Sequence, residues 1–169
     1  MFDGKTFEHM SIGKISKELF AGGDKPNDYS LQHSDIYKYP VFSNGKSGND
    51  LLCYSKEYRV SDPALTISAR GTIGYTAIRE AYFTPVVRLI TLIPTDDVKL
   101  RYLQYCIDSL NLEKSGSGAG QLTVPDFSQY EIMIPPKSLQ VDFENYASSC
   151  DKLKFEAMLR LLNLIVSIE

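Results

Sequence analysis

The sequence has few of the residues that build metal sites or disulfide frameworks. Its three cysteines, Cys53, Cys106 and Cys150, are odd in number and far apart, and its two histidines, His9 and His33, lie in polar segments. Neither histidine is next to a cysteine or within a zinc motif such as His-Glu-x-x-His. We therefore expect a reducing, cytoplasmic location, no metal site and no catalytic residues.

The sequence also lacks a long apolar run and an excess of basic residues. The most apolar stretch, residues 159–168, is shorter than the roughly 20 residues that span a bilayer. The N-terminus shows no signal-peptide pattern, so we expect no membrane contact. Lys and Arg number 18 against 21 Asp and Glu, which gives a formal net charge of −3. This balance argues against a free-standing nucleic-acid-binding protein, because phosphate contacts usually come from a basic excess.

Residues 64–94 form the most β-rich part of the chain. β-branched and aromatic residues gather there in three runs, and glycine and proline lie between the runs. The three expected strands are 65–67, 75–78 and 86–93. Shorter strands are expected at 37–42, 51–58 and 130–134. Amphipathic patterns predict a short helix over 11–20 and a second helix over 98–110 that packs on the sheet.

Polar side chains gather at the bend that follows the first expected strand. Ser68, Arg70 and Thr72 lie there, beside two glycines. An edge with an arginine, hydroxyl groups and accessible backbone suits the recognition of a polar, planar ligand, and no nucleophile–base pair accompanies it. Arg79 and Arg88 fall nearby and are weaker candidates for the same role; Arg88 lies within an apolar run, where structural pairing is the alternative.

The Asn-Gly turn at 43–48 carries two further candidate ligand-binding residues. Asn44 and Lys46 can donate hydrogen bonds to phosphates or base edges, although an ordinary solvated turn is the simpler interpretation. The glycine-rich loop at 115–121 lacks the Gly-Lys-Ser/Thr ending of a phosphate-binding loop. That loop can still contact a ligand through Gln121.

A long helix is predicted after Pro135-Pro136, because no proline or glycine interrupts the chain from Leu139 onwards. Apolar residues recur there at spacings of three and four, as in a coiled-coil seam. The seam residues are Phe143, Tyr146, Cys150, Leu153, Ala157, Leu161, Leu164 and Ile168. So long and apolar a helix needs a partner helix; the alternative is that it folds back on its own domain. We therefore divide the chain into a domain at 1–136 and a helix at 137–169.

These elements together predict an α+β fold. It consists of a mixed or antiparallel β-rich domain with short packing helices, followed by a long helix of the coiled-coil type.

Several short segments, taken in order, resemble the specificity subunit of type I restriction–modification systems. They begin with Ile12-Gly-Lys-Ile-Ser and Ala21-Gly-Gly-Asp-Lys-Pro and continue with Tyr39-Pro-Val-Phe-Ser-Asn-Gly. Thr66-Ile-Ser-Ala-Arg-Gly-Thr-Ile-Gly, Pro85-Val-Val-Arg-Leu-Ile, Tyr102-Leu-Gln-Tyr and Gly118-Ala-Gly-Gln follow. The last is Ile132-Met-Ile-Pro-Pro-Lys-Ser-Leu-Gln, which leads into the long helix. The segments are weak singly, but their order and spacing are specific.

The resemblance implies one target-recognition domain that reads a DNA half-site and a helix that acts as spacer and docking surface. It implies double-stranded DNA, methyltransferase subunits and, in some complexes, a restriction or translocase subunit as partners. S-adenosylmethionine would be bound by the methyltransferase, and this chain would carry no cofactor and no chemistry of its own. A family member usually has two recognition domains, so this chain resembles either a half-subunit that pairs with itself through the helix or a truncated subunit.

For direct DNA contact we single out Arg70, Lys46 and Asn44, with Ser68, Thr72 and Gln121 as secondary candidates; the resemblance itself does not say which of these residues face DNA. Arginine can fork onto guanine, and asparagine or glutamine onto adenine. The competing hypothesis is an oligomerisation or adaptor protein that acts through its helix without reading DNA, and the acidic net charge favours it.

Overall fold

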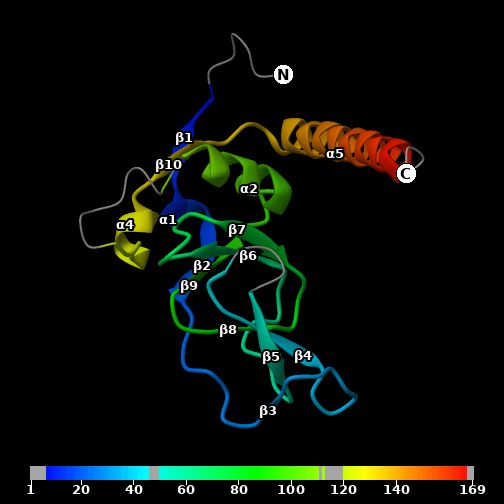
Figure 1. The fold of residues 1–169 in the computed structure, drawn as a ribbon. Helices are drawn as coiled ribbons and strands as arrows, with labels where there is room; N and C mark the ends of the chain where they lie inside the picture. Colours follow the sequence, from blue (N-terminus) through cyan, green and yellow to red (C-terminus); the bar gives the residue numbers. More distant parts are fainter. Residues whose placement is uncertain (1–6, 46–49, 111, 113–119, 167–169) are drawn as a thin grey trace.

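The computed structural model describes residues 7–45, 50–110, 112 and 120–166 (Figure 1). Its first half contains β1 (His9–Ser11), α1 (Ile12–Ile15), β2 (Ser16–Ala21), β3 (Tyr29–Ser30), β4 (Tyr39–Phe42) and β5 (Leu51–Ser55). Its second half contains β6 (Ala64–Ser68), β7 (Thr76–Arg79), β8 (Thr84–Pro85), β9 (Leu89–Pro94), α2 (Leu100–Ser109), α4 (Val124–Ser128), β10 (Glu131–Met133) and α5 (Lys137–Val166). The elements form an α+β fold, as predicted.

The central sheet is antiparallel and has the strand order β2-β9-β6-β7. All five residues of β6 are buried, and β9 is buried along most of its length. Helix α2 packs on β6 and β7, where Leu103 and Ile107 join the largest apolar cluster. The sheet and α2 therefore share one core, as the amphipathic pattern of residues 98–110 predicted.

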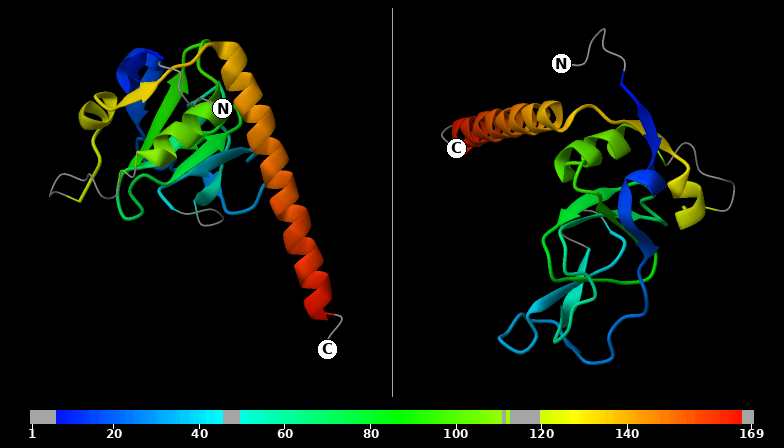
Figure 2. Two further views of the ribbon diagram at one scale, coloured as in Figure 1. Left: turned by 90° about the horizontal axis from the view of Figure 1, so that it is seen from above. Right: turned by 180° about the vertical axis from the view of Figure 1, so that it is seen from behind.

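A second sheet, with the strand order β3-β5-β4-β8, lies at the end of the domain farthest from α5 (Figures 1 and 2). Its β4–β8 pair is parallel, whereas the other pairs are antiparallel, so the domain as a whole is mixed. A separate antiparallel pair, β1 with β10, ties the start of the chain to the segment before α5. Small apolar clusters around Phe83 and Val41 lie between and within the sheets.

The predicted helix over residues 11–20 is wrong after Ile15. Ile12 and Ile15 are buried on α1, but Ser16–Ala21 is a strand that pairs with β9. Pairing with β9 hydrogen-bonds the backbone of this segment, so tertiary context overrides its helical apolar spacing. The strand expected over 86–93 likewise starts only at Leu89, because Arg88 has a φ angle of 72° and lies in the turn before it.

Helix α5 begins at Lys137, close to the expected position, and extends well beyond the domain (Figure 2). Its first half packs on α2. Gln140 is fully buried, and its side chain accepts a hydrogen bond from the Lys99 amide at 2.9 Å. Phe143 contacts the rings of Tyr102 and Tyr105 edge-on. In the described residues, no helix is long and apolar enough to cross a membrane.

Candidate nucleic-acid interface

Four separate segments meet around Ala69 and Arg70, at the end of β6. The Asn44 side chain donates a hydrogen bond to the Arg70 carbonyl oxygen at 3.1 Å, and Arg70 forms a β-bridge with Gln121. The Ala69 amide donates to the Arg88 carbonyl at 2.9 Å. We call the surface formed by Asn44, Arg70, Thr72 and Gln121 the Arg70 edge.

A tight bend presents this edge. The bend closes through hydrogen bonds from the Gly74 amide to the Ser68 carbonyl and from the Ser68 amide to the Tyr75 carbonyl, at 3.0 and 2.9 Å. Gly71 and Gly74 have φ angles of 75° and 83°, a region that glycine adopts without steric cost. The Ala-Arg-Gly-Thr sequence thus holds the Arg70 backbone in place and leaves its side chain exposed.

The structure brings most of the candidate DNA-contacting residues together. Arg70 and Gln121 are exposed, while Asn44 and Thr72 are half-buried. Lys46 lies outside the described residues, so its place at the edge stays a prediction. These side chains offer hydrogen-bond donors and acceptors on a rigid backbone, which is what contact with base edges or phosphates requires.

Ser68 has to be withdrawn as a DNA-contacting residue. It is 0% exposed, and its hydroxyl has no hydrogen-bond partner in the described part of the chain. The reason is that β6 is an interior strand of the sheet and is covered on both faces, since all five of its residues are buried. A side chain with no exposed surface does not reach a base.

Arg79 has a structural role and lies away from the Arg70 edge. Its guanidinium forms an ion pair with Asp50, and both side chains are about nine-tenths buried. Its Nε donates to the Thr66 hydroxyl at 3.0 Å, and its guanidinium carbon lies 3.8 Å from the centre of the Phe42 ring. Arg79 therefore joins the two sheets and is not available to a ligand.

Arg88 was placed wrongly by the sequence pattern. It was expected inside a strand, where structural pairing was one alternative, but it lies exposed in the turn before β9 and one hydrogen bond away from Ala69. The apolar run that surrounds it hid the turn. Pro85, at the start of that run, was the one local sign of a break.

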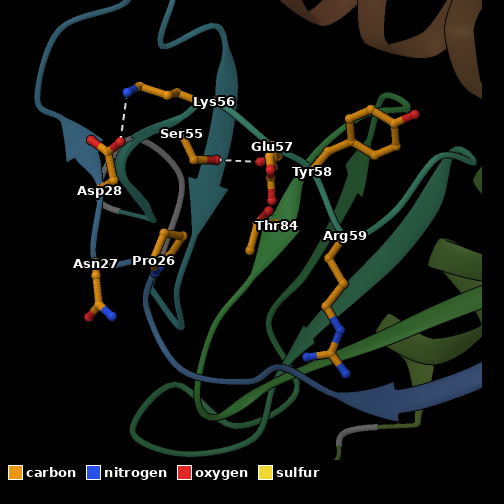
Figure 3. Close-up of a pocket in the computed structure, with 9 residues that line it drawn as sticks. All are labelled: Pro26, Asn27, Asp28, Ser55, Lys56, Glu57, Tyr58, Arg59 and Thr84. Atoms are coloured by element: carbon orange, nitrogen blue, oxygen red, sulfur yellow. Dashed lines mark hydrogen bonds and ion pairs between the residues drawn. The ribbon is translucent and has the colours of Figure 1, made fainter.

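A separate hollow of about 420 Å³ lies at the C-terminal end of β5, whereas the Arg70 edge lies near the start of that strand (Figure 3). Lys56 forms an ion pair with Asp28 at 2.7 Å. The hydrogen bond from Lys56, followed by that from Tyr37, lowers the pKa of the Asp28 carboxyl. Within the lining of this hollow, the Asp28 carboxylate and the Lys56 ammonium group thus pair with each other.

The predicted seam of α5 has two different environments. Phe143 packs on α2 and Cys150 is half-buried, so the start of the helix is partly covered by its own domain. Tyr146, Leu153 and Ala157 are exposed, and Leu153 is 66% exposed. The side chains of Leu161 and Leu164, and Ile168 entirely, lie outside the described residues.

The fold is shared with solved specificity subunits. The HsdS subunit from Thermoanaerobacter tengcongensis superposes with a TM-score of 0.68 at 19% identity, over 89% of this chain and 40% of that one. A chain from a structural study of complex assembly and conformational transition of the type I R-M system gives 0.72 at 19% identity, over 90% and 41%. At these identities, the comparison establishes the fold.

Sequence comparison extends the likeness from fold to family. The model described as "Type I restriction modification DNA specificity domain" matches residues 4–162. Two Mycoplasma pneumoniae proteins named as type I specificity subunits are 34% and 38% identical, over 90% and 76% of this chain. The chain belongs to the type I restriction–modification DNA specificity family. It spans about two fifths of the length of these relatives, 41% and 38%.

Proposed function

We propose that residues 1–136 read one half-site of a double-stranded DNA target through the Arg70 edge and that the chain itself performs no chemistry. Membership of a DNA specificity family supports a role in sequence recognition. The observation that carries the site assignment is the convergence of Asn44, Arg70 and Gln121, from three distant segments, at one exposed edge. An arginine flanked by two amide side chains suits guanine and adenine edges in the major groove.

We further propose that the segment 137–169, which contains α5, docks methyltransferase subunits, joined in some complexes by a restriction subunit, and pairs with another helix of its own kind. The methyltransferase would bind S-adenosylmethionine and modify the target base. It would also supply much of the phosphate contact that a chain of net charge −3 lacks. The exposed seam residues Tyr146, Leu153 and Ala157, which recur at spacings of seven and four and so share one face of the helix, support a helical partner, because solvent does not otherwise stabilise such a stripe.

Arg70→Ala tests the DNA-reading proposal. The hydrogen bond with Asn44 and the bridge with Gln121 both use the Arg70 backbone, which the substitution retains, so the free energy of unfolding should change by less than about 0.5 kcal/mol. Retention on the target duplex should fall roughly 5- to 150-fold, as expected for one bidentate base contact of about 1–3 kcal/mol. The measurement is a titration of the assembled complex with target and scrambled duplexes.

Arg59→Ala is the matched control, because Arg59 is also exposed but lies beside the hollow at the other end of β5. Equal losses for both variants would mean that Arg70 contributes only general charge. Unfolding of Arg70→Ala would instead give the residue a bracing role in the bend.

The second candidate function, an oligomerisation module that does not read DNA, rests on the same exposed stripe of α5. Light scattering of the chain alone and mixed with methyltransferase subunits separates the two. A self-associating chain with no sequence preference in the duplex titration would favour the module.

A further inference from the structure

The turn before β9 holds an arginine in a backbone conformation that L-residues rarely adopt. Arg88 has a φ angle of 72°, and among the described non-glycine residues only Tyr82 shares this region. Glycine or asparagine would occupy the position with less steric conflict. The presence of an arginine therefore needs a reason beyond the shape of the turn.

The turn is firmly fixed to the Arg70 edge. The Arg88 carbonyl accepts the hydrogen bond from the Ala69 amide, and the Leu89 amide donates to the Val86 carbonyl at 3.2 Å. On the other side, the Gly22 amide donates to the Leu89 carbonyl at 2.8 Å. These bonds place the Arg88 backbone directly beside the residue that precedes Arg70.

The Arg88 side chain has no polar partner among the described residues. It is exposed, and in the described part of the chain no hydrogen bond or ion pair holds its guanidinium. Arg79 and Arg101, by contrast, are paired with Asp50 and Asp151. The neighbouring Val87 is apolar and 48% exposed. A strained backbone thus presents an unpaired cation and an apolar side chain next to a surface that already carries Arg70.

We propose that Arg88 is a second specificity-determining residue, which forks onto a guanine edge in the major groove beside the base that Arg70 contacts. The inference rests on the proposed function and deepens it. Two arginines on adjoining, hydrogen-bonded segments would read neighbouring base pairs, and the exposed Val87 would favour a thymine methyl group over a polar edge. The fixed turn orients the guanidinium before binding, which reduces the entropy lost on contact.

The test uses the full specificity protein in complex with its methyltransferase subunits. Bound duplexes are selected from a random 40-bp pool, first with the wild type and then with Arg88→Gly and Arg88→Lys. Glycine relieves the positive φ, so Arg88→Gly should show an unchanged or higher thermal midpoint. The same variant should lose roughly 5- to 150-fold in affinity for the wild-type motif and show relaxed preference at one guanine position.

Each outcome is decisive. Lysine keeps the positive charge of Arg88 but cannot make two parallel hydrogen bonds to guanine. A weaker preference for guanine in both Arg88→Gly and Arg88→Lys therefore supports base contact. If affinity falls equally for motif and scrambled duplexes, and the slope of log affinity against log salt concentration decreases by about 1, Arg88 contacts a phosphate and the proposal is overturned. An unchanged motif and affinity would also overturn it, while the proposed function would stand. If the wild type selects no motif, the proposed function itself fails. Lys38→Ala, at the start of β4 and far from the Arg70 edge, controls for loss of one exposed positive charge.

Discussion

Gln140→Leu should loosen the attachment of α5 to the domain. The Gln140 side chain is 0% exposed and bonds to three backbone groups. Its oxygen accepts from the Lys99 amide at 2.9 Å, and its amide donates to the carbonyls of Asp97 and Pro135 at 3.0 and 2.9 Å. Leucine has a similar size and no polar atom, so the change removes the bonds without leaving a large cavity.

The expected magnitude follows from the surroundings of these three groups. Pro135 is buried, so its carbonyl cannot regain a partner from water. Asp97 is exposed and Lys99 is half-buried, and their backbone groups can be partly solvated. A buried carbonyl that loses its hydrogen-bond partner, such as that of Pro135, costs about 1–3 kcal/mol, and the backbone groups of Asp97 and Lys99 cost less. The free energy of unfolding should therefore fall by about 2–4 kcal/mol.

Urea denaturation followed by circular dichroism measures this loss, and hydrogen exchange locates it. Amides at the start of α2 and in the first half of α5 should exchange faster than in the wild type. Gln104→Leu is the control, since that α2 glutamine makes one long hydrogen bond to Thr76 at 3.4 Å. Equal, small losses for both variants, or exchange spread evenly over the sheets, would refute the assignment of Gln140 as the anchor of α5.

Two further predictions concern the core. Arg79→Met leaves the buried Asp50 carboxylate without its cation, so the free energy of unfolding should fall by about 3–5 kcal/mol in urea; a loss under 1 kcal/mol would contradict the pairing. At high pH, burial raises the pKa of the Tyr102 hydroxyl and of the Cys106 thiol above their ordinary values of 10.0 and 9.0. The folded chain then keeps protons that the unfolded chain loses, so the contribution of these two groups to stability should be fully present at neutral pH and be lost as the pH rises through their ordinary values. A urea titration at several pH values checks this, and Tyr102→Phe should weaken the dependence; a flat profile for the wild type would oppose it.

Strong local patterns predicted much of the fold. The strands at Ala64–Ser68 and Thr76–Arg79, the amphipathic α2 and the uninterrupted α5 were all expected from periodicity and from glycine and proline positions. These elements carry their signal within a few residues. The strand Ser16–Ala21 was missed, because its conformation depends on pairing with Leu89–Pro94, far along the chain.

The candidate site was predictable in part, for the same reason. The bend that carries Arg70 follows from its two glycines, and the Asn-Gly turn marked Asn44. That both reach one edge, together with Gln121, depends on a hydrogen bond and a bridge between distant segments. The burial of Ser68 depends on strand order, which no local pattern contains.

Three arginines show why topology decides the site. Arg70, Arg79 and Arg88 all lie within the β-rich stretch 64–94, and composition alone does not separate them. In the sheet, Arg79 pairs opposite Ala64, at the far end of β6 from Arg70, and there meets Asp50 and Phe42. Antiparallel pairing of β6 with β9 brings Arg88 back to the Arg70 end. The three arginines thus lie at alternate ends of one sheet, so that Arg79 is structural whereas Arg70 and Arg88 are exposed. Gln140 anchors α5 to the same domain. The direction in which α5 leaves the domain is therefore fixed with respect to Arg70 and Arg88.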